Sequence, residues 1–358
     1  MAEPNLFTDT IRIIVEGGDL DSDRASSAMD QIMTGAVTPA QIGAFVTALR
    51  MRGETIAEIA GFAATMRRHA LRVEVELDGA PLVDTCGTGG DASGTFNIST
   101  TAAFVIAGAG VRVAKHGNRA VTSKCGSADL LEALGVAIEL APAFVARCVN
   151  DVGIGFMYAP AFHPAMRFVG PTRREIGIRT VFNVLGPLTN PAGARHQLIG
   201  VGHPGIAGKL ASALAQLGST HAVLVHAEEG LDELGLSGSS QVTDYDARSG
   251  AVRTYSLVPE DAGLSRAPVG ALAGGDVATN MKITLGVLDG SSGPPRDATL
   301  LNAGAGIYAA DAATSIAEGV EQATEAIDSG RAWDTLQRLV ALSNELARES
   351  HSETAALA

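Results

Sequence analysis

Apolar residues recur along this chain with two different spacings. Up to about residue 72, apolar residues such as Ile42, Phe45 and Leu49 recur at the three- and four-residue spacing of an amphipathic helix. Further along, short apolar segments typical of buried strands alternate with helical segments. The pattern predicts a small helical domain over residues 1–72 and a larger α/β domain over residues 73–358.

The strand and helix segments of the larger domain follow one another in a regular order. Such alternation favours a central, mostly parallel sheet whose ligand-binding loops lie at the carboxyl ends of the strands. Residues 164–191 break the alternation, and we expect part of this segment to join the helical domain. Predicted strands cover residues 82–85, 111–114, 154–158, 198–201 and 222–226, with a hairpin of residues 241–246 and 252–257; predicted helices cover residues 100–108, 127–134, 276–288, 298–309, 312–328 and 333–347.

A glycine-rich segment from Asp84 to Thr100 joins the first predicted strand to the next helix. Its glycines allow positive φ angles and expose successive backbone N–H groups, and the free N–H groups of the next helix begin near Ser99. These features predict an anion site. Asp91 adds negative charge, which suits a ligand that also offers hydroxyl groups or carries a metal ion, such as a sugar phosphate. The spacing matches neither a P-loop nor a dinucleotide-binding loop.

Composition narrows the class of protein. With 46% apolar residues and a mean hydropathy of +0.19, the 358-residue chain can bury a full core. No apolar run approaches the roughly 18 residues of a membrane span, and the N-terminus lacks signal-peptide features, so we expect a cytoplasmic protein without a membrane partner. Three cysteines without metal-ligand spacing argue against a disulfide framework or a zinc site.

Charge is distributed unevenly along the chain. The net charge of −13 argues against nucleic acid as a partner. Residues 111–124 reverse this balance, because they contain Arg112, Lys115, Arg119 and Lys124 and no acid. A basic segment in an acidic protein favours a binding site for a small polyanion.

Four segments carry a resemblance to a known family: Asp84 to Thr100, Val113 to Gly135, Arg173 to Pro191 and Gly230 to Leu234. Through them, the chain resembles the anthranilate phosphoribosyltransferases of tryptophan biosynthesis over nearly its whole length. The resemblance implies a nucleoside phosphorylase/phosphoribosyltransferase-like fold and a homodimer with contacts from the helical domain. It also implies the reaction: the amino group of anthranilate attacks C1 of 5-phosphoribosyl 1-pyrophosphate, which gives N-(5-phosphoribosyl)anthranilate and pyrophosphate.

The family pattern also implies which residues bind 5-phosphoribosyl 1-pyrophosphate and Mg²⁺. Asp232 and Glu233 would hold the metal, with Ser99 as a further ligand, because hard oxygen ligands shared with phosphates are usual for Mg²⁺. The phosphoribosyl substrate would contact both polar loops, namely Gly87, Gly90, Asp91, Thr95, Asn97, Ile98, Ser99, Thr100, Lys115, His116, Gly117, Asn118, Arg119, Ala120, Val121, Thr122, Ser123 and Ser127.

Anthranilate needs a cation for its carboxylate and an apolar slot for its ring. The resemblance implies Gly87, Asn118 and Arg173 as its contacts, and the planar guanidinium of Arg173 suits a carboxylate; Arg174 is the rival cation. We assign no catalytic residue from the sequence, since an arylamine already has a free lone pair. His116 is the only candidate proton acceptor in the two loops.

Several alternatives stay open at this level. Ser127 could cap the helix that begins there as well as contact phosphate. Gly235 to Gly238 differs from the continuation associated with the family, so the loop after the paired acids is open. Two other functions compete with the transferase. One is a pyrimidine nucleoside phosphorylase-like enzyme, against which Lys115 to Arg119 argues, and the other is a non-enzymatic nucleic-acid-binding relative, against which the net charge argues.

Overall fold

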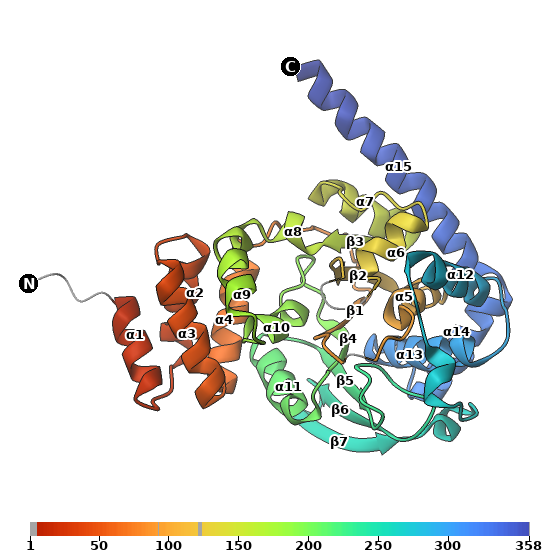
Figure 1. Cartoon of the computed structure of the whole chain (residues 1–358). Coiled ribbons are helices and arrows are strands. Elements are labelled where there is room, and N and C mark those ends of the chain that lie inside the picture. Colours follow the sequence, from red (N-terminus) through yellow and green to blue (C-terminus); the bar gives the residue numbers. More distant parts are fainter. Residues whose placement is uncertain (1–5, 92, 121–123, 358) are drawn as a thin grey trace, which may run out of the picture.

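The computed structural model describes residues 6–91, 93–120 and 124–357. Four helices form a bundle at the N-terminal end, drawn in red and orange in Figure 1. Thr38 and Thr55 fix where two of them begin, because each threonine hydroxyl accepts a backbone N–H three residues on, and Gln41 or Glu58 bonds back to the threonine N–H. The helices are α1 Leu6–Val15, α2 Ser22–Met33, α3 Pro39–Arg52 and α4 Ile56–His69.

A seven-stranded sheet occupies the centre of the rest of the chain, in the order β3-β2-β1-β4-β5-β6-β7. The strands from β3 to β5 in this order run parallel, and β6 and β7 add an antiparallel hairpin at one edge. The parallel strands are short apolar segments that are mostly buried, as expected for a sheet covered on both faces. They are β1 Leu82–Gly87, β2 Arg112–Gly117, β3 Ile154–Tyr158, β4 His196–Gly200 and β5 His221–Ala227, followed by β6 Ser240–Asp246 and β7 Ala251–Leu257.

Helices cover both faces of this sheet (Figure 1). Successive residues of β5 point to opposite faces, so that Val223 and Val225 join one hydrophobic core while Ala222 and Leu224 join the other. The first core contains α5, α7, α13, α14 and α15, and the second contains α11 and continues into the N-terminal bundle. The covering helices are α5 Ile98–Gly108, α6 Ser127–Ala133, α7 Pro142–Val152, α11 Ala207–Gln216, α12 Val277–Leu288, α13 Pro294–Ala309, α14 Ile316–Asp328 and α15 Arg331–Leu357.

The chain between β3 and β4 leaves the sheet and lies against the N-terminal bundle. It contains α8 (Ala159–Phe162), α9 (Gly170–Ile176) and α10 (Phe182–Leu185). α9 packs on α3 and α10 contacts α4. α9 touches α3 at Gly43, where an added Cβ would lie at an ordinary contact distance, 3.7 Å, from Cδ1 of Ile176. The domain bounds of 1–72 and 73–358 stay a prediction.

The predicted fold class is confirmed, with a helical N-terminal part and a mostly parallel sheet. Three helix bounds differ from the prediction by four residues or more. α13 begins at Pro294 instead of Ala298, because proline fits the first turn of a helix, and α14 begins at Ile316, where the Ser315 side chain caps it. α15 continues past Ala347 to Leu357. Among the described residues, no helix is both long and apolar enough to cross a membrane.

Candidate active site

The first glycine loop leaves β1 at Gly87 and leads to the start of α5. Gly89 and Gly90 have φ angles of +63° and +82°, in the left-handed region that favours glycine. Gly87 is required for a different reason, because a Cβ there would lie 2.7 Å from Oδ2 of Asp232. The loop is therefore shaped by its glycines and by an acid that lies far away in the sequence.

The paired acids predicted as metal ligands reach this loop from the connection after β5. The N–H of Gly89 donates to Oδ2 of Asp232 at 3.0 Å, and the N–H of Ser99 donates to Oε1 of Glu233 at 3.2 Å. Asn302 of α13 holds the next residue, Leu234, through both its backbone N–H and its carbonyl at 3.0 Å. The two carboxylates are thus fixed against the glycine loop and the first turn of α5.

Burial and charge repulsion act together on this carboxylate pair. Desolvation, followed by the charge of Asp91, raises the pKa of Asp232 to about 7, and desolvation with the charge of Asp232 raises the pKa of Glu233 to about 8. A divalent cation would offset this repulsion, so the hard oxygen donors fit Mg²⁺. The described residues form no cluster of three or more His, Cys, Asp or Glu side chains that could hold a metal ion.

Lys115, on β2, places a cation beside the start of α5. Its side chain is only 3% exposed, and its ammonium donates to the carbonyl of Thr85 and lies 3.4 Å from Oγ of Ser99. Burial lowers the pKa of Lys115, while the nearby charge of Asp84 opposes that change. Lys115 therefore stands beside Ser99 and the acid pair.

Asp84 fixes the ends of β1 and β2 relative to each other. Its side chain is fully buried; Oδ1 accepts the N–H of His116 at 3.1 Å and Oδ2 accepts Nδ2 of Asn190 at 2.8 Å. The same Asn190 nitrogen donates to the carbonyl of Ala114 at 2.8 Å. Sequence reasoning did not assign a role to Asp84 or Asn190, because both act through contacts between distant segments.

The cations of the basic segment, residues 111–124, have different surroundings in the fold. Arg119 pairs with Glu132 and, at 3.2 Å, with Asp129, and these partners raise the pKa of its guanidinium. Arg112 donates instead to the carbonyl of Glu76. Arg112 and Arg119 are thus paired within the fold and Lys115 is buried, while the polyanion site expected over residues 111–124 stays a prediction.

The start of α6 is capped differently from the expectation. Gly126 is the N-cap residue, and Oδ2 of Asp129 accepts the N–H groups of Gly126 and Ala120, each at 2.9 Å. Ser127 is not the cap; its hydroxyl donates to the carbonyl of Asn118 at 3.1 Å, which ties the loop after β2 to α6. Val121, Thr122 and Ser123 lie outside the described residues.

The remaining predicted residues of the first loop contribute in different ways. The side chain of Asn97 donates to the carbonyl of Cys125 at 3.1 Å and accepts Nδ2 of Asn280 at 2.9 Å, so it joins the two loops to α12. Ser93 donates to Asp91 and lies 3.3 Å from the hydroxyl of Thr95. The side chains of Ile98 and Thr100 are buried, and any contact with a ligand at these positions would be made by the backbone.

His116, which follows Lys115 on β2, lies against a second histidine, His163. The rings of His116 and His163 are 5.0 Å apart, and Nε2 of each is buried without a hydrogen-bond partner among the described residues. Burial lowers the pKa of His116 to about 3 and that of His163 to about 4, so both rings are neutral near pH 7. Sequence reasoning missed His163; the segment Phe162 to Pro164, next to β3, gave no spacing signal.

The two arginines considered for anthranilate differ in their surroundings. Arg173 on α9 is half-buried, its guanidinium lies 5.6 Å from the centre of the Phe182 ring, and burial lowers its pKa. Arg174 is exposed. The half-buried guanidinium is the better candidate to pair with a carboxylate, because a charge-assisted pair is stronger where water is excluded.

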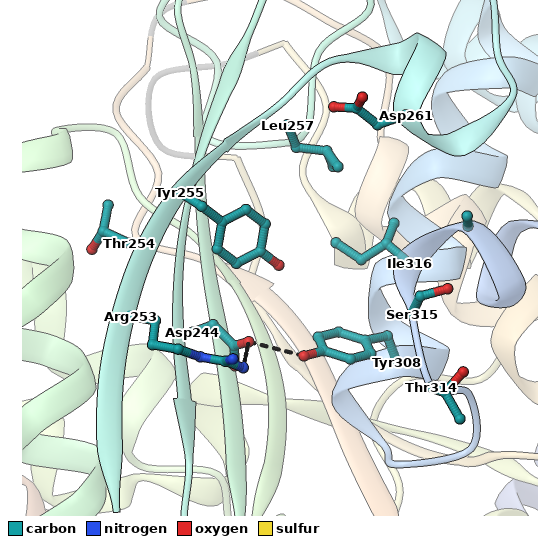
Figure 2. A pocket seen from close by; sticks show the side chains of 11 residues that line it. Asp244, Arg253, Thr254, Tyr255, Leu257, Asp261, Tyr308, Thr314, Ser315 and Ile316 are labelled. Carbon is teal, nitrogen blue, oxygen red and sulfur yellow. Dashed lines mark hydrogen bonds and ion pairs between the residues drawn. The ribbon is translucent and has the colours of Figure 1, made fainter. Parts of the chain in front are cut away.

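A depression of about 490 Å³ lies elsewhere, between β7 and the connection of α13 to α14 (Figure 2). Tyr308 donates to Oδ2 of Asp244 at 2.9 Å, and Arg253 pairs with the same oxygen at 3.2 Å. From the other side, His221 bonds to Oδ1 of Asp244 at 3.0 Å. Because Asp244 is occupied by partners within the fold, we interpret this cluster as structural.

Comparison with known proteins agrees with this geometry. Residues 79–333 match the model described as "Glycosyl transferase family, a/b domain", and residues 8–70 match that of its helical bundle domain. Anthranilate phosphoribosyltransferase of Chloroflexus aggregans is 57% identical over 337 residues, which cover 94% of this chain and 98% of that protein.

Solved structures give the same result. The anthranilate phosphoribosyltransferase of Thermus thermophilus is 45% identical, with a TM-score of 0.88 over 94% of this chain and 99% of that one. The enzyme of Saccharomyces cerevisiae in complex with 5-phosphoribosyl 1-pyrophosphate (PRPP) and Mg is 29% identical, with a TM-score of 0.86 over 96% of this chain and 99% of that one. A further structure of the yeast enzyme holds 4-fluoroanthranilate. The chain belongs to the anthranilate phosphoribosyltransferase family.

Proposed function

We propose that this protein transfers the 5-phosphoribosyl group of PRPP to the amino group of anthranilate, releasing pyrophosphate. The main support for this function is that the glycine loop, the buried Lys115 and two carboxylates meet at the first turn of α5. The pKa values of both carboxyl groups, Asp232 and Glu233, are raised. Backbone N–H groups, a cation and hard oxygen ligands are the groups that recognise a phosphorylated sugar with its metal ion. The relatives of this chain bear the name of the same activity.

The phosphate side would be formed by the two loops and the connection after β5. Asp232, Glu233 and Ser99 would hold Mg²⁺, which when bound neutralises the charge that develops on departing pyrophosphate. Lys115 contributes a fixed positive charge beside Ser99. Gly87, Gly90 and Asn118 would contact substrate, as expected from the sequence, mainly through the backbone and one amide.

The chemical step is a displacement at C1 of the ribose. The bond from the anthranilate nitrogen to C1 forms as the bond from C1 to pyrophosphate oxygen breaks, and the nitrogen then gives up a proton. Holding both substrates in line and stabilising the leaving group supply most of the rate enhancement in such a reaction. His116, neutral near pH 7, is a candidate acceptor for that proton, although its lowered pKa makes it a weak base.

The acceptor side would be formed by α9 and the end of β2. Arg173 would pair with the carboxylate of anthranilate, since its guanidinium is half-buried and planar. The rings of His116 and His163 would line the aromatic slot, because neutral buried imidazoles present apolar faces.

A homodimer is the proposed assembly, with the N-terminal bundle as the interface. Leu6, Val15 and Met51 are 50%, 70% and 84% exposed on α1 and α3, and such exposed apolar side chains favour burial against a second copy. Met51→Glu should shift the protein toward monomer in light scattering coupled to gel filtration. A wild-type protein that elutes as a monomer at micromolar concentration would end this proposal.

One assay tests the reaction itself. Loss of anthranilate fluorescence is followed with PRPP and Mg²⁺, and uridine with inorganic phosphate serves as the substrate pair of the competing phosphorylase. We expect turnover only with PRPP, anthranilate and Mg²⁺ together. Cleavage of uridine, or no turnover of anthranilate by the folded protein, would contradict the proposed function.

A further inference from the structure

Arg179, in the segment between α9 and α10, reaches across to the first glycine loop. Its Nη2 donates to the carbonyl of Gly89 at 3.0 Å and lies 3.5 Å from the carbonyl of Thr88. The guanidinium also lies against Gly90, where an added Cβ would overlap it. Next to Arg179, the N–H of Thr180 donates to Oδ1 of Asn183 at 2.9 Å, which anchors the backbone that carries the arginine.

The contact determines how one peptide group of the loop is oriented. The carbonyl of Gly89 and the N–H of Gly90 belong to the same planar trans peptide, so they point in opposite directions. With its oxygen bonded to Arg179, this peptide turns the Gly90 N–H away from the arginine. That N–H has no hydrogen-bond partner among the described residues. A backbone donor is therefore held ready for a ligand.

The preceding peptide, between Thr88 and Gly89, is held at both its carbonyl and its N–H. Its carbonyl, on Thr88, faces Arg179, and its N–H, on Gly89, donates to Asp232 at 3.0 Å. Glycines with positive φ have wide conformational freedom, and here Arg179 and Asp232 restrict it at two successive peptides. Donors that are already oriented bind an anion more strongly than donors that must first be ordered.

We propose that Arg179 is a positioning residue for the phosphoribosyl substrate: it orients the peptide between Gly89 and Gly90 so that the Gly90 N–H binds a phosphate oxygen. This inference rests on the proposed function of the same site. Arg179 acts through the loop backbone, and its own charge does not contact the substrate. Its removal leaves the protein folded, because the side chain is exposed.

The test measures the dissociation constant of PRPP with Mg²⁺ by calorimetry, together with kcat and both Michaelis constants. Losing one oriented donor to a charged phosphate corresponds to about a tenfold change in affinity. Arg179→Ala should therefore weaken PRPP binding about tenfold, leave the Michaelis constant for anthranilate within twofold, and keep the melting temperature. Arg174→Ala, the exposed control on α9, should match the wild type.

Ionic strength separates positioning from direct charge contact. Salt screens a charge that meets the phosphate but not an effect transmitted through the backbone, so the ratio of the PRPP dissociation constants of Arg179→Ala and the wild type should stay the same within twofold from low to high salt. A ratio that falls steeply as salt is added, or PRPP affinity of Arg179→Ala within twofold of the wild type, would overturn the inference while wild-type turnover upholds the proposed function. No turnover by the wild type refutes the function itself.

Discussion

The carboxylate of Glu233 accepts the N–H of Ser99 at 3.2 Å, so an acid from the connection after β5 lies on the first turn of α5. A helix start is a place where anions are stabilised, and the same N–H groups would serve a phosphate. The acid must therefore share this space with the substrate, which is reasonable only if a cation mediates between them.

Replacing both acids tests their role in holding the metal. Asp232→Ala with Glu233→Ala should lower kcat/KM at least a hundredfold and raise the Mg²⁺ concentration needed for half-maximal rate, since the hard ligands of the ion are lost. Kinetics titrated with Mg²⁺ measure both quantities. Glu228→Ala, an exposed acid on the same connection, is the control. Wild-type Mg²⁺ dependence in the double variant would remove these residues from the metal site.

Ser99→Ala tests the first turn of α5. The hydroxyl lies 3.4 Å from the ammonium of Lys115, and its loss should weaken binding of PRPP with Mg²⁺ about tenfold. The free energy of unfolding should fall by no more than about 1 kcal/mol, because a single partly exposed hydroxyl contributes little to the fold. Calorimetry and urea denaturation give the two values. An affinity within twofold of the wild type counts against a phosphate site here.

Arg173→Ala tests the anthranilate side. Removing a bidentate, charge-assisted partner from a site that excludes water costs about 2–5 kcal/mol of binding free energy. The Michaelis constant for anthranilate should rise far more than that for PRPP, and Arg173→Lys should recover little, because an ammonium cannot reproduce the planar fork. Arg174→Ala is the matched control. If Arg174→Ala were the variant with the selective loss, the assignment would move by one residue.

His221 makes stability depend on pH. Burial disfavours its charged form, but hydrogen bonds to Asp244 at 3.0 Å and Asp311 at 2.8 Å prevail and raise its pKa. A raised folded-state pKa gives stability that is complete below the unfolded value of about 6.5 and is lost as pH rises through the folded value.

The variant His221→Asn should therefore lose most stability, relative to the wild type, below about pH 6.5 and progressively less at alkaline pH. Arg253 on Asp244 and Arg248 on Asp311 also face this cluster. Urea denaturation from pH 5.5 to 9.5 measures the difference, with exposed His203→Asn as control. A loss that does not vary with pH would mean that His221 contributes by packing alone.

Sequence patterns predicted the elements more fully than the contacts between them. The strand Leu82 to Gly87 and the helix after it were predictable, because an apolar run, a glycine cluster and a second apolar run are local signals. The far end of α15 was not, since its polar sequence after Ala347 has no apolar face, although its residue types suit a helix.

The contacts within the candidate site could not be predicted from the sequence either. Asp232 and Glu233 were found only through a family resemblance, as two adjacent acids carry no local signal. The pairing of Arg119 with Glu132, the ring contact of His116 with His163, and the reach of Arg179 to Gly89 depend on how distant segments pack. Periodicity and spacing contain no information about such contacts, so the ion pairs of Arg119 were not predicted and His163 was missed.

The bond from Gly89 to Asp232 joins positions 143 residues apart. A growing chain thus displays its glycine loop long before the acids that close it exist, and an incomplete chain has no site in which to sequester a phosphorylated sugar. Contacts of such separation form late, because the entropy of closing a long loop must be overcome first. Substrate therefore binds only molecules in which these distant segments have come together, and it stabilises the folded state of those molecules alone.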